Sequence, residues 1–567
     1  MADQTITVND KKLSYQPNLT DFQQLNSKLV TDLAKEIDYY PGGNLNAAFN
    51  AVERHSKNQN RNKVALFHLD ENLFETKLTF FELNKLSNQF ANFLKSLQVE
   101  RGDRVFFFLP RVPEMIYGFL GTLKRGAIAG TLFSAFGEDA LFDRLSLSGA
   151  KVVITSAELV DRIHAIRKRL PELKHIYTLS DLERLLKSQP EEYQTCHTLP
   201  LDPAFMLFTS GTTGKPKGVV HAHQAIIQQH LTAKYVLDIK PNDVYWCTAD
   251  PGWVTGIAYQ ILGSLSTAAS SVVYQGRFDP LVWYKIIEKY RVSVWYTAPT
   301  AIRMLKAAGE KPVKFHNLSS LRHLLSVGEP LNPSALLWAY QTYGLPFHDT
   351  WWQTETGAIM ISNFPCLNIK PGSMGKPFAG IKAAIVDDQG KELPAMTEGN
   401  LAIKKGWTSM MIKIWKRPKK YRSYFVNGWY LSGDLAYQDK DGYFWFVGRA
   451  DDVIKTSGER VGPFEVESAI VSYPGVVEAG VIGKPDELRG QIIKAFVALN
   501  PDLKPSEKLK EEIKEHVKKH LAGHAYPKEI EFVKTLPKTR SGKIVRRLLR
   551  AKELGLPFGD TSTLEDF

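Results

Sequence analysis

The chain has 567 residues, of which 44% are hydrophobic and 23% are charged, and its formal net charge is +12. This is the composition of a folded globular protein; it excludes a disordered chain and an integral membrane protein, and the length requires two or more domains. The basic excess fits nucleic acid, a membrane surface or a phosphate-rich small molecule as a partner.

Targeting and membrane signals are weak in this sequence. The N-terminus shows no basic stretch followed by an apolar core, so no signal peptide is expected. The longest apolar run, residues 258–274, is interrupted by Gln260 and by hydroxyl residues. Cys196, Cys247 and Cys366 lie far apart without metal-ligand spacing. We therefore expect a cytoplasmic protein that has no membrane partner and whose cysteines are core residues.

Apolar runs alternate with amphipathic helical patterns, which predicts an α/β fold. In chain order, we expect a helix at residues 80–96 and strands at residues 105–109, 151–155 and 271–274. Residues 436–449 instead predict a β-hairpin that turns at residues 439–442. A polar break follows, and we place a domain boundary near residue 450, which divides the chain into residues 1–450 and 451–567.

Much of the positive charge lies between residues 504 and 552. There, residues 506–521 predict an amphipathic helix with Leu509, Ile513, Val517 and Leu521 on one face and lysines on the others. A solvated basic face and an anion-binding face explain these lysines equally well. No RNA-binding aromatic motif or zinc-finger spacing accompanies them, so no nucleic-acid partner is expected.

The strongest local signal is the run Thr-Ser-Gly-Thr-Thr-Gly-Lys-Pro-Lys-Gly at residues 209–218, directly after the apolar strand expected at 204–208. Glycines let the backbone approach an anion, hydroxyls donate hydrogen bonds, and Lys215 and Lys217 add positive charge. Only two residues separate Gly211 from Gly214, and Pro216 follows Lys215, so this is not the common NTPase loop. The alternatives are a distinct phosphate loop and a flexible surface turn.

Residues 209–218 are similar to the phosphate loop of the adenylate-forming superfamily, which includes acyl-CoA ligases, luciferases and peptide-synthetase adenylation domains. Residues 350–357, residues 430–434 with 448–452, and residues 537–543 resemble further motifs of that superfamily in the same order. Residues 42–46, 53–55, 250–256, 327–330 and 455–460 resemble its acetyl-CoA synthetase branch. Glu459 and Tyr473 differ from the residues expected in longer members of that branch.

This resemblance implies a large N-terminal domain of mixed α/β subdomains and a small, mobile C-terminal α+β domain. It also implies ATP, coenzyme A and Mg²⁺ as substrates and cofactor. Glu355 and Thr212 would hold the metal. The implied ATP-binding residues are Thr209, Ser210, Gly211, Thr212, Thr213, Gly214, Lys215, Gly328, Glu329, Pro330, Asp349, Thr350, Trp351, Trp352, Gln353, Thr354, Asp434, Arg449 and Arg460.

Lys543 would be the catalytic residue, bridging the acid and the α-phosphate of ATP. A carboxylate is already a nucleophile, so its attack on that phosphate needs charge neutralisation and in-line geometry rather than a general base. A rotation about the hinge Asp451 would then exchange Lys543 for residues 455–460. Control by a lysine acetyltransferase and a deacetylase acting on Lys543 is a further implication, because acetylation removes the charge.

Trp352 stands where a tryptophan closes the acyl pocket in the acetyl branch. An indole fills the space that a longer acid needs, which predicts acetate as the substrate and leaves propionate as an alternative. The remaining acyl-pocket residues would be Val254, Thr255 and Val327, and those that bind coenzyme A would be Ala298, Ser457 and Gly458.

Other functions explain less of the sequence. A carrier-protein adenylation enzyme usually adjoins a carrier domain, and none is seen after Phe567. A luciferase-like oxygenase would need a roomier pocket than Trp352 leaves, and a nucleic-acid-binding protein would leave every motif unexplained. We therefore expect an AMP-forming acetate–CoA ligase.

Overall fold

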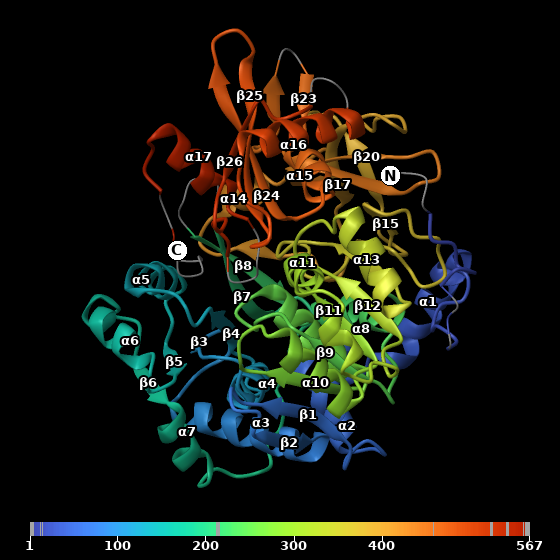
Figure 1. The fold of residues 1–567 in the computed structure, drawn as a ribbon. Helices are drawn as coiled ribbons and strands as arrows, with labels where there is room; N and C mark the ends of the chain where they lie inside the picture. The colour runs from blue at the N-terminus through green and yellow to red at the C-terminus, as the bar shows by residue number, and fades with distance from the viewer. Residues whose placement is uncertain are drawn as a thin grey trace.

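The strands of the described part of the chain form three sheets, two of them in the larger N-terminal part and one in the C-terminal part (Figure 1). The computed structural model describes residues 5–11, 13, 15–210, 216–456, 459–521, 525–539, 544–558 and 561. Within these residues, no helix combines the length and apolarity that a membrane crossing needs.

The first sheet has the strand order β18-β8-β7-β4-β3-β5-β6. Its strands are β3 (Arg104–Phe108), β4 (Ile128–Leu132), β5 (Val152–Thr155), β6 (His175–Thr178), β7 (Pro203–Ser210), β8 (Pro216–Ala222) and β18 (Lys413–Ile414). Phe107 packs among side chains of α3 (Phe80–Ser96) and α4 (Pro113–Lys124), whereas Phe106 packs among those of α5 (Glu138–Ser148) and α6 (Val160–Ile166). Both faces are therefore buried, which explains the unbroken apolar runs and confirms the expected strands.

Helix α3 spans the residues that its periodicity predicts. It starts at Phe80 because Thr79 and Glu82 form a capping box: the Glu82 N–H donates to Thr79 Oγ1 at 3.2 Å, and the Thr79 N–H donates to Glu82 Oε2 at 2.8 Å.

The second sheet combines a parallel half with an antiparallel half. The parallel half is β13 (Phe347–Trp351), β12 (His323–Ser326), β11 (Val294–Thr297), β9 (Val244–Cys247), β10 (Ser270–Tyr274) and β1 (Val64–Leu69), with β2 (Glu75–Thr79) antiparallel at its edge. The antiparallel half is β14 (Ile361–Ser362), β15 (Ser373–Pro377), β21 (Phe444–Arg449), β20 (Trp429–Gln438), β17 (Gly399–Lys404) and β16 (Ala383–Val386), with β19 (Phe425–Val426) beside β20. Strand β10 confirms the strand expected at residues 271–274.

The predicted hairpin is confirmed as β20 and β21. Asp434 pairs with Arg449 in its register, and the Gly442 N–H donates to the Asp439 carbonyl across the turn. Gly442 has a φ of +85°, which a residue with a side chain rarely adopts.

The C-terminal sheet has the order β23-β22-β25-β24, with β26 beside β25. Its elements are β22 (Ile454–Thr456), β23 (Glu459–Val461), α15 (Pro463–Val471), β24 (Val476–Asp486), β25 (Gly490–Leu499), α16 (Glu507–His520), β26 (Glu529–Phe532) and α17 (Arg546–Leu554). Helix α16 confirms the amphipathic prediction, since Leu509, Ile513 and Val517 are buried. The large sheet ends at Arg449 and this sheet begins at Ile454, so the predicted boundary near residue 450 falls close to the connection between them.

The other main helices are α1 (Leu25–Glu36), α7 (Leu179–Leu186), α8 (Ala225–Tyr235), α10 (Pro280–Tyr290), α11 (Pro299–Ala308) and α13 (Pro333–Tyr343). A π-helix at Gly256–Leu262 continues into α9 (Gly263–Ser266). The apolar run at residues 258–274 is therefore a buried helical segment followed by strand β10.

Candidate active site

Parallel strands bring the predicted nucleotide segments to one edge of the large sheet. Strands β11, β12 and β13 run side by side in the same direction, so the segments after Thr297, Ser326 and Trp351 leave the sheet together. Ligands of such sheets bind at the carboxyl ends of the strands. This edge therefore gathers Ala298, residues 327–330 and residues 351–355.

Asp434 is the centre of a buried polar network at this edge. Its side chain accepts hydrogen bonds from Trp351 Nε1 at 2.9 Å and from Gln353 Nε2 at 3.0 Å, and Arg449 Nε lies 3.3 Å from Oδ1. Burial lowers the pKa of the Arg449 guanidinium, but Asp434 and neighbouring aspartates outweigh this effect and raise the pKa above its ordinary value. Asp434 is only 4% exposed, so these donors hold its carboxylate in one orientation.

Glu355 is the buried acid that the resemblance assigns to a metal. Lys217 Nζ lies 2.9 Å from Glu355 Oε1, Tyr424 donates to the same oxygen at 3.3 Å, and Lys217 also contacts the Tyr424 hydroxyl. Burial alone would raise the pKa of Glu355, but Lys217 outweighs it and the pKa falls below its ordinary value. Glu355 therefore presents an ionised carboxylate.

This carboxylate fits a metal that is shared with phosphate oxygens. Mg²⁺ commonly takes one or two carboxylates from a protein and fills its other positions with water and phosphate. The described residues contain no group of three or more His, Cys, Asp or Glu that could hold a metal by themselves. Thr212, the other predicted ligand, lies outside the described residues.

Asp349 and Thr350 use their side chains to hold the end of the sheet. Asp349 accepts from Ser326 Oγ at 2.6 Å and from the Leu331 N–H at 3.3 Å, which ties β13 to the loop at residues 327–331. Burial raises the pKa of the Asp349 carboxyl to about 7. The Thr350 hydroxyl donates to the Ser326 carbonyl at 2.8 Å. Contact of these two residues with a nucleotide stays a prediction.

The loop at residues 328–330 connects β12 to α13. Gly328 is exposed, with a φ of +102° that favours glycine. Glu329 Oε1 accepts from Thr300 Oγ1 at 2.5 Å and from Arg303 Nη2 at 2.8 Å, so its carboxylate is directed toward α11. Arg303 is a member of this site that the sequence analysis missed, because no local motif marks it.

Trp352 is half-buried at the end of β13, where two tyrosines fix its indole. Its Nε1 donates to the Tyr296 hydroxyl at 3.2 Å, and its ring meets that of Tyr259 edge-on, with centroids 5.1 Å apart. Trp352, Val254 and Val327 belong to one hydrophobic cluster, and Thr255 precedes the π-helix. Sequence reasoning missed both tyrosines, because Tyr259 lies in a π-helix and Tyr296 on strand β11, both far from Trp352 in the chain.

Several predicted residues lie outside the described part of the chain: Gly211, Thr212, Thr213, Gly214, Lys215, Ser457, Gly458 and Lys543. Ser210 and Arg460 are placed in β7 and β23 by their backbones. The Thr209 hydroxyl is buried and finds no hydrogen-bond partner among the described residues, which leaves a donor beside the predicted phosphate loop. Thr354 contributes its carbonyl, which lies 2.7 Å from His221 Nε2.

The C-terminal part turns one face toward this site. The pKa of Arg546 is raised chiefly by Glu467 against the effect of burial, and Glu329 of the large domain contributes to the same shift. Arg546 follows Lys543 by three positions. The β22–β23 hairpin, in contrast, lies at the end of the C-terminal sheet that points away from the larger part (Figure 1).

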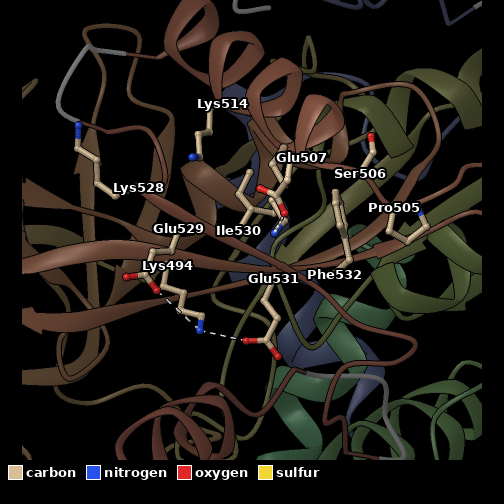
Figure 2. A pocket seen from close by; sticks show the side chains of 11 residues that line it. Lys494, Pro505, Ser506, Glu507, Lys514, Lys528, Glu529, Ile530, Glu531 and Phe532 are labelled. Atoms are coloured by element: carbon tan, nitrogen blue, oxygen red, sulfur yellow. Dashed lines mark hydrogen bonds and ion pairs between the residues drawn. The ribbon is translucent and has the colours of Figure 1, made fainter.

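A cavity of about 600 Å³ lies within the C-terminal part, between α16 and β26 (Figure 2). Two of its lysines pair with glutamates of the same lining: Lys494 lies 3.0 Å from Glu531 and 3.8 Å from Glu529, and Lys510 lies 2.7 Å from Glu507. None of the predicted site residues lines this cavity.

Comparison with known proteins identifies the class. A family model described as AMP-binding enzyme matches residues 52–412, and one described as AMP-binding enzyme C-terminal domain matches residues 465–543. Among solved structures, an anthranilate CoA ligase in complex with anthranoyl-AMP has a TM-score of 0.84 at 32% identity, covering 90% of this chain and 97% of that one. A benzoate CoA ligase from Burkholderia xenovorans LB400 has a TM-score of 0.81 at 27% identity, covering 89% and 99%. The fold is thus the expected adenylate-forming one.

Curated relatives show to which family of AMP-binding enzymes the chain belongs. The chain is 54% identical over 536 residues to an acetyl-coenzyme A synthetase of Bacillus subtilis (strain 168), covering 92% of this chain and 93% of that protein. It is 43% identical over 567 residues to an acetyl-coenzyme A synthetase of Methanothrix thermoacetophila, covering 93% and 86%. The chain therefore belongs to the acetyl-coenzyme A synthetase family of AMP-binding enzymes, which confirms the resemblance.

Proposed function

We propose that this protein is an AMP-forming acetate–CoA ligase, which converts ATP, acetate and coenzyme A to acetyl-CoA, AMP and pyrophosphate through an acetyl-adenylate. The similarity to acetyl-coenzyme A synthetases over almost the whole chain carries this proposal. The indole of Trp352, fixed by Tyr259 and Tyr296, supports a small acid as the substrate.

The polar network at the sheet edge supports an ATP site. Asp434, oriented by Trp351, Gln353 and Arg449, would accept hydrogen bonds from the ribose hydroxyls. The loop at residues 209–215 would bind the departing pyrophosphate, and residues 328–330 and 349–354 would line the adenine pocket, with Arg460 contacting ribose or phosphate. Glu355 and Thr212 would hold Mg²⁺, which supplies neutralising charge at the phosphates when bound.

The first half-reaction would depend on Lys543. The acetate oxygen forms a bond to the α-phosphorus as the bond from that phosphorus to the pyrophosphate oxygen breaks, and Lys543 would stabilise the charge on both reactants. The electrostatic contribution of Glu329 to the raised pKa of Arg546 supports a pose in which this face of the C-terminal domain covers the site.

The second half-reaction would use the opposite face. Rotation about Asp451 would bring residues 455–460 to the adenylate, where Ala298, Ser457 and Gly458 would line the path of the pantetheine arm. The coenzyme A thiol would then attack the acetyl carbon, form the thioester and release AMP. The proposed hinge at Asp451 divides the chain into an N-terminal domain, residues 1–450, and a C-terminal domain, residues 451–567.

The protein would be regulated at Lys543 and located in the cytoplasm. Acetylation of Lys543 would remove its charge and silence adenylation, so a lysine acetyltransferase and a deacetylase are proposed partners. The free thiols of Cys196, Cys247 and Cys366 support a reducing cytoplasm as the location.

Pyrophosphate release measured over carboxylates of one to eight carbons tests the substrate. Acetate should give the highest specificity constant and butyrate a much lower one. A preference for propionate would point to the alternative short-chain ligase, and a preference for hexanoate would refute the proposed acyl pocket. Adenylation without transfer to coenzyme A would point instead to a carrier-protein adenylation enzyme.

A further inference from the structure

Asn332 occupies the N-cap position of α13 but does not cap that helix. An asparagine at this position usually accepts a hydrogen bond from the backbone two or three residues later. In α13, every residue of which is described, no such side-chain bond is present. Asn332 Nδ2 instead donates to Ser468 Oγ at 2.9 Å, and its Oδ1 accepts from Arg303 Nη1 at 3.1 Å. Positions that depart from the usual local relation between sequence and structure, such as helix capping, are often functional.

The bond from Asn332 to Ser468 crosses between the two parts of the molecule. Helix α13 belongs to the N-terminal part, and Ser468 lies on α15 of the C-terminal part, which Figure 1 draws in the upper part of the molecule. Asn332 is only 4% exposed while α15 is in place, so this bond forms in a shielded position in the observed pose.

On the N-terminal side, this bond is connected to the predicted adenine loop. Arg303 holds the Asn332 carbonyl oxygen with one nitrogen and Glu329 with another, at 3.1 Å and 2.8 Å. The position of the loop at residues 328–330 and the orientation of the Asn332 amide therefore depend on the same guanidinium.

On the C-terminal side, the same helix carries the anchor of Arg546. Glu467, adjacent to Ser468, receives Arg546 Nε at 2.8 Å and Nη2 at 2.5 Å, and Arg546 Nη1 lies 3.7 Å from Asp452 beside the predicted hinge. Fixing α15 therefore fixes the start of α17, three residues after Lys543.

We propose that the Asn332–Ser468 hydrogen bond is a latch that holds the C-terminal domain in the pose that forms the acyl-adenylate. Asn332 and Ser468 are then positioning residues for Lys543. Release of this bond would accompany the rotation that begins thioester formation. This inference rests on the proposed two-step function.

Ser468→Ala tests the latch, and Ser472→Ala, at the C-cap of the same helix, is the matched control. The Ser472 hydroxyl donates to the Ala469 carbonyl at 2.7 Å and lies 2.8 Å from His516 Nε2, both within the C-terminal part. Two rates are measured for each variant: acetate-dependent ATP–pyrophosphate exchange, and thioester formation from supplied acetyl-adenylate and coenzyme A. Ser468→Thr keeps a hydroxyl and should rescue the exchange.

Ser468→Ala should slow exchange about fivefold, the effect of one net hydrogen bond, and leave thioester formation equal or faster. Asn332→Ala also removes the acceptor of Arg303, so its loss of exchange should be at least as large, and adding Ser468→Ala to Asn332→Ala should slow exchange no further. Equal losses in both rates, or an exchange rate like that of Ser472→Ala, would overturn the latch while leaving the proposed function intact. A wild-type protein without acetate-dependent exchange would overturn the proposed function itself.

Discussion

Replacing Trp352 by glycine should convert a ligase for small acids into one that prefers longer acids. The indole is anchored by the Tyr296 hydroxyl and by the edge-on contact with Tyr259, so turning it aside for a longer chain would break both contacts. Forcing extra methylenes into such a packed space costs roughly 1–3 kcal/mol.

Once the indole is removed, each added methylene of the acid gains about 0.8 kcal/mol on burial. Butyrate has two more methylenes than acetate and gains about 1.6 kcal/mol, which corresponds to roughly 15-fold in relative kcat/KM. Acetate itself should become a poorer substrate, because its methyl group loses the surface against which it packs.

The assay is pyrophosphate release with saturating ATP and coenzyme A, over acids of two to eight carbons. Trp351→Phe is the matched control, because the Trp351 indole donates to Asp434 at 2.9 Å and should affect ATP rather than the acid. That control should raise KM for ATP and keep the order of acids unchanged. A Trp352→Gly variant that folds normally and retains the wild-type order of acids would refute the assignment of the acyl pocket.

Three further outcomes follow from the site. Asp434→Ala should lower kcat/KM for ATP by roughly 10- to 150-fold, the cost of about 1.5–3 kcal/mol for losing hydrogen bonds to a charged group, with KM for acetate little changed; an unaltered ATP dependence would contradict the ribose role. Burial raises the pKa of Asp349 from 3.8 to about 7, so the folded state binds the extra proton and the contribution of this residue to the free energy of unfolding falls as pH rises from about 4 to above 7. Asp349→Asn should flatten that pH dependence in denaturant unfolding, and an unchanged slope would contradict it. Stoichiometric acetylation of Lys543, verified by mass spectrometry, should abolish adenylation, and deacetylation should restore it. Full activity in an acetylated sample would contradict regulation by acetylation of this lysine.

Local sequence patterns predicted the elements that bury either both faces or a single face. The strand at residues 105–109 is apolar throughout because helices cover both faces, and the stripe formed by Leu509, Ile513 and Val517 marks the one buried face of α16. The joining of β13, β14, β15 and β21 into one sheet was not predictable, because it depends on pairings between segments that are far apart in the chain.

The motifs likewise predicted the segments of the candidate site better than its internal contacts. Trp352 could be singled out by resemblance, but Tyr259 reaches it from a π-helix and Tyr296 from strand β11, two strands away in the sheet, and neither segment carries a motif. Asn332 shows the reverse problem, since the usual rule for helix ends predicts a cap that the structure replaces with a contact between domains.

Lys543 offers the sharpest division between the two half-reactions. The proposed role of this lysine ends when pyrophosphate leaves, whereas that of Gly458 begins only when coenzyme A approaches the adenylate. Lys543→Ala should therefore lose acetate-dependent ATP–pyrophosphate exchange while still forming acetyl-CoA from supplied acetyl-adenylate and coenzyme A, and Gly458→Leu should show the opposite pattern. Equal loss of both half-reactions in both variants would contradict a single site served in turn by two faces of the C-terminal domain.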